Sequence, residues 1–204
     1  TELHRRFIDY HEHVVRSSLG TVRRYRSATR HLVNYCQQCG REVPAHEVDA
    51  EGFARYLRSV RVAPNGHANT ARRRLRDKGV RYILETCRSM YGYAAKKRLM
   101  PPYADNPFAG LGGKRISIED AKRVFVYSQA TEAKFFRAAD EWALPIHFLL
   151  AKTGLRPGEA THLLIEEVDL DAGWIEVRNK RELGWRIKTR RERSVPLIAE
   201  VGLV

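Results

Sequence analysis

The residues best suited to chemistry lie in one stretch, Thr153-Gly154-Leu155-Arg156-Pro157-Gly158-Glu159-Ala160. A phosphodiester under attack gathers negative charge on its non-bridging oxygens, and a planar guanidinium can donate two parallel hydrogen bonds to them. Arg156 suits that task, because Gly154 and Pro157 predict a turn that holds its backbone in place. The simpler interpretation is a surface ion pair between Arg156 and Glu159, three residues apart.

A second group of charged residues follows downstream. Trp174 to Val177 and Ser194 to Leu197 look like short strands, and a basic segment joins them. Its cations are Lys180, Arg181, Arg186, Lys188, Arg190 and Arg191. The simpler interpretation of this segment is a solvated loop.

These residues together resemble the first catalytic box of the tyrosine recombinases, the phage-integrase superfamily. The family pattern is Thr-Gly-Leu-Arg, a nearby Glu, then a Leu, an Asp and a β-hairpin, and here Leu163 and Asp169 follow in order. Residues 188–197, Lys-Thr-Arg-Arg-Glu-Arg-Ser-Val-Pro-Leu, are similar to the hairpin's second half, where the family keeps a catalytic lysine. The region ending in Tyr93-Ala94 and Asp105-Asn106-Pro107 is more loosely similar to the family's core-binding domain.

The resemblance implies roles for individual residues. Arg156 would stabilise the phosphate, Lys188 would donate a proton to the departing 5′-oxygen, and Glu159 would support the site. Neighbouring cations make a lysine give up its proton more readily, and Lys188 has several. Lys180 is the second choice for this lysine.

The resemblance also implies a reaction and partners. The expected substrate is double-stranded DNA, broken and rejoined through a 3′-phosphotyrosyl intermediate that conserves the bond energy. We therefore expect site-specific DNA recombination or integration without nucleotide, metal or other cofactor, and without a small-molecule substrate. An intact protein of this family, such as a mobile-element integrase, would form a homotetramer on two duplexes.

The sequence departs from the family pattern after the hairpin. The family needs a His or Lys, two residues, an Arg, then a His or Trp and the nucleophilic Tyr. All nine tyrosines, from Tyr10 to Tyr127, precede Arg156. We therefore expect these 204 residues to be the N-terminal part of a longer recombinase that cannot cleave DNA alone. The alternative is a non-catalytic DNA-binding module that occupies recombination sites.

Composition favours a nucleic-acid partner. Lys plus Arg number 37 against 24 Asp plus Glu, a net charge of +13, which indicates a polyanion. The longest strongly apolar run, between Glu141 and Lys152, is too short for a membrane helix, and the first thirty residues lack a signal peptide's apolar core. Three cysteines cannot form a closed disulfide framework. We expect a cytoplasmic, bacterial or phage-encoded protein; RNA binding is disfavoured because no aromatic-studded RNA motif is present.

Charge is distributed unevenly along the chain. Residues 1–108 hold 21 Lys plus Arg against 10 Asp plus Glu, and residues 109–204 hold 16 against 14. Asn106-Pro107 is a turn signal, and the glycine-rich stretch after it lacks helical periodicity. We predict a core-binding domain at 1–108, a linker at 109–118 and an incomplete catalytic domain at 119–204.

Apolar residues recur at helical spacing in residues 1–108. We expect helices at about 3–15, from Thr21 to Gly40, after Asp49, and from Thr70 to Leu99. They would form a small all-α bundle whose surface arginines contact DNA phosphates. The predicted DNA-binding residues are Arg72, Arg73, Arg74, Arg76 and Arg81, with Arg190 and Arg191 further along the chain. A solvated helix face is the simpler interpretation.

The second half of the chain is of mixed structure. Ser128 or Thr131 can start one helix, residues 144–151 predict a buried helix, and Pro157 opens another before the two strands. The predicted fold class is mainly α with a small β-hairpin. It comprises an all-α core-binding bundle followed by a truncated α+β catalytic domain of the tyrosine-recombinase type.

Cys36 and Cys39 have the spacing of zinc ligands, with His31 and His46 nearby. A single pair is a weak signal, and Cys39 fits the apolar stripe of its helix. We therefore predict no metal site.

Overall fold

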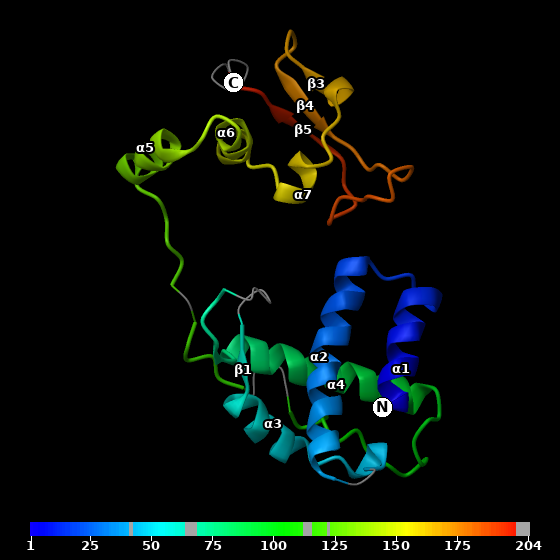
Figure 1. Ribbon diagram of the computed structural model, residues 1–204. Coiled ribbons are helices and arrows are strands. Elements are labelled where there is room, and N and C mark those ends of the chain that lie inside the picture. The colour runs from blue at the N-terminus through cyan, green and yellow to red at the C-terminus, as the bar shows by residue number, and fades with distance from the viewer. Residues whose placement is uncertain (41–42, 64–68, 112–115, 122, 199–204) are drawn as a thin grey trace. The chain divides into compact units, whose positions relative to one another are not determined.

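The structure is a computed structural model, and it describes residues 1–40, 43–63, 69–111, 116–121 and 123–198. The chain divides into two compact units, Thr1–Arg123 (unit 1) and Val124–Val204 (unit 2). Figure 1 shows unit 1 as a helical bundle and unit 2 as helices beside a small sheet. Within the described ranges, no helix combines the length and apolar character needed to cross a membrane.

Unit 1 is a bundle in which α4 contacts α1, α2 and α3. The elements of the bundle are α1 (Glu2–Asp9), the π-helical turn η1 (Tyr10–Val14), α2 (Leu19–Gln38), the 3-10 turn η2 (Ala45–Glu47), α3 (Ala50–Ser59) and α4 (Asp77–Lys96). One apolar cluster fills the space between them, with Phe53, Leu57 and Leu84 completely buried. The predicted all-α bundle is thus present, and a short ribbon of two strands is added to it.

Two helix starts test the predicted caps. α3 follows Asp49, whose carboxylate accepts the N–H of Gly52 at 2.8 Å, as predicted. The predicted start of α2 at Thr21 was wrong. Ser18 caps this helix by accepting the N–H of Thr21 at 3.3 Å, so the helix begins earlier, at Leu19.

The helix predicted from Thr70 to Leu99 was wrong over its first part. α4 begins at Asp77, and the arginines before it form β2 (Arg73–Arg74), which pairs antiparallel with β1 (Arg61–Val62). The N–H of Leu75 extends this pairing by donating to the carbonyl of Val60 at 3.1 Å. Backbone pairing with a segment eleven to fifteen residues earlier in the chain therefore overrides local helical propensity here.

The boundary between the units lies later than the predicted linker at 109–118. Leu111 and Ile116 pack against the core of unit 1. Asp77 accepts the N–H groups of Glu119 and Asp120 at 3.0 and 3.4 Å, and its own N–H donates to Asp120 at 3.0 Å. These contacts fasten the end of unit 1 to α4, while predicted linker residues 112–115 lie outside the described residues.

Unit 2 contains three helices and one antiparallel sheet within its described residues. The elements are α5 (Gln129–Ala138), α6 (Ala143–Thr153), α7 (Pro157–Ala160), the 3-10 turn η5 (Ile165–Glu167), β3 (Val168–Asp169), β4 (Trp174–Val177) and β5 (Arg193–Pro196). The strand order is β3-β4-β5, so the predicted hairpin is present and a third strand joins it. Ser128 caps α5 by accepting the N–H of Thr131 at 3.2 Å.

The predicted burial of the 144–151 helix was wrong. None of the described residues of α6 is fully buried, and Ile146 is 41% exposed. Leu149 and Leu150 pack against the small core formed by Leu155 and the sheet. A helix that is apolar on all sides needs cover on all sides, and the described part of unit 2 covers one face.

Asp77 provides a test of how the last segment of unit 1 is held. The hydrogen bond from the Glu119 backbone, with a further contribution from Arg58, lowers the pKa of the Asp77 carboxyl. We expect Asp77→Ala to speed amide hydrogen exchange at Glu119 and Asp120 about tenfold, because charge-assisted bonds to both N–H groups are lost. Asp105→Ala removes an exposed carboxylate as the control. Unchanged exchange at 119 and 120 would show that other contacts hold the segment.

Candidate functional site

A rigid turn carries Arg156 from α6 into α7. α6 ends at Gly154, whose φ of 65° is the left-handed conformation that favours glycine. The Thr153 hydroxyl accepts the N–H of Leu155 at 3.3 Å, and Leu155 is buried in the core of unit 2. Pro157 then starts α7 with its φ already helical. Arg156 is thus fixed at the backbone on both sides, as the sequence predicted for this turn.

Glu159 is the centre of the site. Its carboxylate is 2% exposed and accepts four hydrogen bonds. Oε1 accepts from Nη1 of Arg156 at 2.8 Å and from Nη1 of Arg193 at 3.0 Å, while Oε2 accepts from the Arg156 N–H at 2.8 Å and from Nη2 of Arg193 at 2.7 Å. A carboxylate has about four acceptor positions, so Glu159 is saturated.

The four bonds favour the ionised form of Glu159. Hydrogen bonds from Arg193, followed by those from the backbone and side chain of Arg156, lower its pKa from 4.5 to about 2, although burial acts in the opposite direction. Arg193 binds the carboxylate through both terminal nitrogens, which is the strongest geometry for this pair. Glu159 therefore remains an anion and a fixed anchor for two guanidinium groups.

Arg156 keeps donors that are not used in this anchor. Its side chain is 49% exposed and binds Glu159 through Nη1. Among the described residues, Nε and Nη2 of Arg156 have no hydrogen-bond partner. The guanidinium is therefore positioned on one side and open on the other, where an anionic oxygen can bind.

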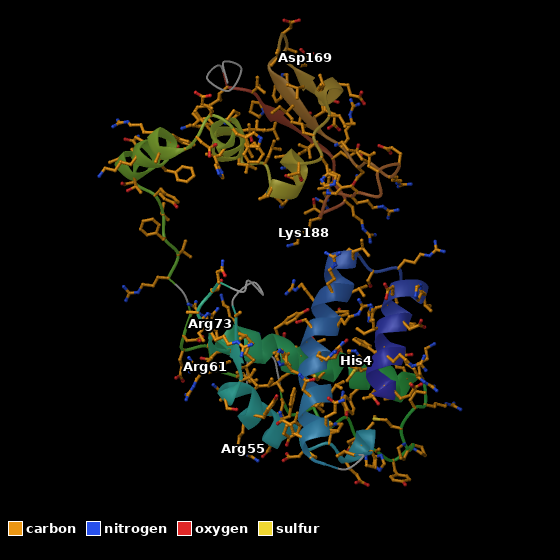
Figure 2. All side chains as sticks on the ribbon, viewed as in Figure 1. His4, Arg55, Arg61, Arg73, Asp169 and Lys188 are labelled. Atoms are coloured by element: carbon orange, nitrogen blue, oxygen red, sulfur yellow. The ribbon has the colours of Figure 1, made fainter. Side chains whose placement is uncertain are left out.

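The sheet places the basic loop at one end of unit 2. Ile175 pairs with Val195 and Val177 pairs with Arg193. Asp169 closes the turn at the other end by accepting the N–H of Ala172 at 2.7 Å. Figure 2 shows Lys188 and Asp169 at opposite ends of the sheet of unit 2. The sequence prediction that the cations lie between two paired strands is correct.

Asn179 closes the loop between β4 and β5. Its side-chain oxygen accepts the N–H of Ile187 at 2.9 Å, and its backbone N–H donates to Glu192 at 2.9 Å. Ile187 is 1% exposed and packs in the same core as Leu155. The loop is therefore tied at its base and by a buried side chain next to Lys188.

Lys180, the second choice for the catalytic lysine, is buried and paired with a carboxylate. Its ammonium lies 2.7 Å from the Glu167 carboxylate, and both side chains are 3% exposed. Lys180 also exchanges two backbone hydrogen bonds with Trp185, and its Nζ lies 5.2 Å from the centre of that indole ring. The indole stacks on His162 at 4.9 Å, just after α7. This group fastens the loop to the segment that carries Arg156.

Lys188 has the opposite environment. It is exposed, and it has no hydrogen bond or ion pair to any described residue. Arg190 and Arg191 follow it on the same loop and are also exposed, with Arg190 at a φ of 58°. The structure does not bring Lys188 into contact with Arg156 or Glu159; the two parts of the site are connected through Ile187 and Trp185.

The predicted DNA-binding arginines of unit 1 are not on one helix face. Arg72, Arg73 and Arg74 are exposed on or beside the β1–β2 ribbon. Arg76 is half-buried at the start of α4, and Arg81 pairs with Glu85 at 3.0 Å. Three of the five predicted residues are therefore exposed cations on the ribbon.

Sequence reasoning missed Arg193. This residue lies 34 positions after Glu159, so no local spacing connects them. The available signal was its place in β5, since a charged side chain directly before Ser194-Val195 would face either solvent or a partner anion. Burial of Glu159 without a second cation would have been costly, because a single exposed arginine leaves half of the carboxylate unpaired.

Within the described ranges, Cys36 and Cys39 have no third metal ligand beside them. The Cys39 thiol donates to the carbonyl of Tyr35 at 3.5 Å. Among the described residues, no group of three or more His, Cys, Asp or Glu side chains is placed to hold a metal ion.

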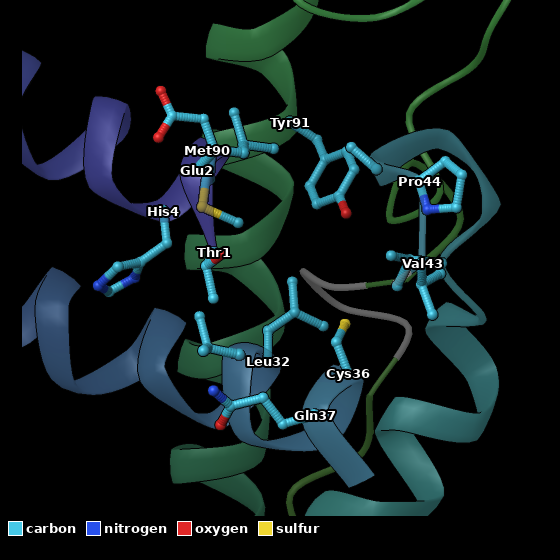
Figure 3. A pocket seen from close by; sticks show the side chains of 14 residues that line it. Thr1, Glu2, His4, Leu32, Cys36, Gln37, Val43, Pro44, Met90 and Tyr91 are labelled. Atoms are coloured by element: carbon cyan, nitrogen blue, oxygen red, sulfur yellow. The ribbon is translucent and has the colours of Figure 1, made fainter. Parts of the chain in front are cut away.

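A cavity of about 620 Å³ lies in unit 1, and Cys36, Leu32, Met90 and Tyr91 are among the residues that line it. Figure 3 shows these side chains facing the same space from different helices. The lining is mostly apolar and belongs to unit 1, whereas Arg156 belongs to unit 2. None of the described residues that line the cavity is among the predicted catalytic or DNA-binding residues.

Comparison with known proteins supports an integrase fold. No family model and no curated protein matches the sequence. The solved structures of the Tn1549 transposon integrase in complex with a circular intermediate DNA and with transposon right end DNA match 98% of this chain with TM-scores of 0.67, at 18% and 17% identity. The chain covers 62% of those integrase chains. The predicted fold class is confirmed, and the resemblance to the recombinases is confirmed at the level of the fold.

Replacing Glu159 tests the anchor. Because the folded pKa is lowered, Glu159 stabilises the fold fully above about pH 4.5 and loses that contribution as the pH falls toward 2. We expect Glu159→Gln to lower the free energy of unfolding of unit 2 by about 2–3 kcal/mol at pH 7, with a smaller deficit at pH 3. Urea unfolding at the two pH values measures both quantities.

The matched control is Glu166→Gln, which removes an exposed carboxylate that lacks a hydrogen bond to any described residue. This variant should unfold like the parent chain at both pH values. An equal loss of stability in the two variants would mean that net charge, rather than the bonds to Arg156 and Arg193, sets the effect.

Replacing Lys180 tests the buried ion pair. Lys180→Met leaves the Glu167 carboxylate buried and unpaired, which should cost about 3–5 kcal/mol of unfolding free energy. Glu167→Gln in the same chain should recover most of that loss, because the neutral amide still accepts the N–H of Leu164, now bonded at 3.0 Å. A double-mutant cycle by urea unfolding measures the coupling. A single-variant loss below about 1 kcal/mol would contradict a fixed buried pair.

Proposed function

We propose that this chain is the DNA-binding and first catalytic part of a tyrosine-type site-specific recombinase. In the complete protein it would break and rejoin double-stranded DNA through a 3′-phosphotyrosyl intermediate. The observation that carries the proposal is the Arg156 guanidinium, held by a saturated Glu159 and open on its other side. All nine tyrosines of these 204 residues precede Arg156, so the proposal assigns the nucleophile to none of them.

Arg156 would act on the phosphate. Negative charge grows on the non-bridging oxygens as the fifth ligand approaches phosphorus, and a fixed guanidinium stabilises it without reorganising at the moment of reaction. Glu159 is a positioning residue because it touches Arg156 and not the DNA. Arg193 completes the anchor, since without it half of the carboxylate would be open to compete with the phosphate for Arg156.

Lys188 would act on the leaving group. The 5′-oxygen departs as an alkoxide unless a proton reaches it, and an exposed ammonium on a tied loop can supply that proton. Lys180 is buried and paired with Glu167, which supports Lys188 for this role. Because the phosphotyrosyl bond would conserve the energy of the broken phosphodiester, the reaction needs no nucleotide cofactor.

DNA binding would depend on the cations. The net charge of +13 and the exposed arginines of the ribbon and of the 188–191 loop fit a duplex partner. Two solved Tn1549 integrase structures that match this chain are complexes with DNA, which supports a DNA partner here. Assembly of four protomers on two duplexes is part of the same proposal. A binding module without chemistry is the second candidate, since the same net charge and exposed arginines support it.

Covalent trapping by the complete protein separates the two candidates. Sheared DNA from the source genome is incubated with the complete protein, and covalent complexes are collected under denaturing conditions. We expect the parent to retain DNA, and Arg156→Ala and Arg156→Lys to lose at least about 100-fold of the trapping rate, since a lysine lacks the guanidinium geometry. Arg137→Ala on α5 is the matched control. No trapping by the parent supports the binding module; full trapping by Arg156→Ala refutes the site.

The DNA sequence recovered from the covalent complexes is then used to make a duplex that tests the proton donation proposed for Lys188. A duplex with sulfur at the 5′-bridging position has a leaving thiolate that needs no proton, because thiols are far more acidic than alcohols. Lys188→Ala should trap ordinary DNA about 100-fold more slowly and the sulfur-bridged duplex at nearly the parent rate. Equal defects on both substrates would assign Lys188 to binding rather than to proton transfer.

A further inference from the structure

The β1–β2 ribbon of unit 1 has two chemically different faces. Arg61 is directly opposite Arg74, and Val62 is directly opposite Arg73. Residues directly opposite one another point to the same side of an antiparallel pair, and neighbours along a strand alternate. One face therefore presents Arg61 and Arg74 together, whereas Arg73 belongs to the other face.

The apolar residues of the ribbon identify the face that turns toward the protein. Val60 and Val62 are half-buried, and Leu75 packs against the core of unit 1. The N–H of Leu75 donates to the Val60 carbonyl at 3.1 Å, so these residues share the face of Val62. Arg61 and Arg74 are exposed on the opposite, outward face.

No carboxylate of the described chain neutralises this face. Arg61 binds the backbone carbonyl of Arg72 at 3.0 Å, and Arg74 makes no ion pair with a described residue. The nearby Arg58 differs, because it is paired with Asp77 at 2.8 Å. Figure 2 shows Arg61 and Arg73 on the ribbon of unit 1. Like charges directly opposite one another destabilise a strand pair, so the ribbon carries a local cost that an external anion would remove.

The chemistry of the face favours the phosphates of a duplex. Guanidinium groups bind phosphate oxygens through paired donors, and a two-stranded ribbon has the width that the major groove of DNA admits. Residues 60–76 contain no Phe, Tyr or Trp, so the ribbon lacks the stacking side chains that hold single-stranded bases.

We propose that the outward face of the β1–β2 ribbon, carrying Arg61 and Arg74, is a docking surface for the phosphate backbone of duplex DNA. The inference rests on the proposed function and makes it more specific. It adds Arg61 to the DNA contacts and separates Arg74 from its neighbour Arg73. The proposal also implies that Arg61 and Arg74 strengthen DNA binding and, without DNA, lower the stability of the ribbon.

The test compares the full chain with two variants of equal charge on a mixed-sequence 30-base-pair duplex at several salt concentrations. Arg61→Gln/Arg74→Gln removes two charges from the outward face, and the matched variant Arg98→Gln/Arg137→Gln removes two exposed charges elsewhere, one just after α4 and one on α5. We expect the first variant to bind at least tenfold more weakly at low salt, with the slope of log affinity against log salt reduced by about 2. The matched variant should reduce the slope of log affinity against log salt by less than about half of the reduction seen in Arg61→Gln/Arg74→Gln.

A second measurement tests whether Arg61 and Arg74 lower the stability of the ribbon in the absence of DNA. Amide exchange at Leu75 reports the opening of the ribbon, because this N–H donates to Val60. Without DNA, exchange should be slower in Arg61→Gln/Arg74→Gln than in the parent, since the like-charge pair is gone. Adding duplex DNA should slow exchange in the parent and have much less effect in the variant. If Arg61 and Arg74 had a merely structural role, exchange at Leu75 would be faster in the variant than in the parent, and that result would contradict the proposal.

The outcomes separate this inference from the proposed function. Failure of the parent chain to bind any duplex refutes both. Binding with equal slopes in the two variants refutes the ribbon face and leaves recombinase function intact. Stronger competition by single-stranded DNA or by RNA than by the duplex also overturns the proposal, because it assigns the arginines to another polyanion.

Discussion

The saturated Glu159 carboxylate is the interaction on which the site of unit 2 depends. It accepts hydrogen bonds from the backbone N–H and the side chain of Arg156 and from both terminal nitrogens of Arg193. A buried anion with fewer hydrogen bonds would take up a proton or draw in water. The turn that carries Arg156 would then be held less firmly. The bonds also join α7 to β5, so the helical half of unit 2 and its sheet are held by the same group.

Fixing the loop is the second requirement, and it is met by different chemistry. Asn179 ties the base of the loop, and Ile187 buries a side chain next to Lys188. The Lys180–Glu167 pair gives a polar anchor inside an otherwise small apolar core. Removing two charges from water is costly, and an apolar pair of the same shape can be equally stable. The ion pair joins the loop to η5, because Lys180 lies in the loop and Glu167 lies in that turn.

The sequence predicted features that depend on neighbouring residues and missed those that depend on distant pairing. The turn at Arg156, the Asp49 and Ser128 caps and the strands around the basic loop follow from local residue types. Arg193 could not be connected to Glu159 across 34 residues, and the ribbon replaced a predicted helix because Arg74 pairs with Arg61. Burial of α6 was overestimated for the same reason, since apolar character shows that a helix needs cover and not which segment supplies it.

The arginines of the two units illustrate two uses of one side chain. In unit 2, Arg193 is neutralised within the fold, so its position is fixed before any ligand arrives. On the ribbon of unit 1, Arg61 and Arg74 oppose each other without a described carboxylate, and their repulsion reduces the stability of the strand pair. Under the proposed function, the first arrangement would provide precision at a reacting centre. The second would provide affinity that depends on salt, because binding would exchange counterions for phosphates. A protein proposed to hold a long polyanion and to act on one of its phosphates would need both arrangements, and here they differ in whether a carboxylate of the described chain accompanies the arginine.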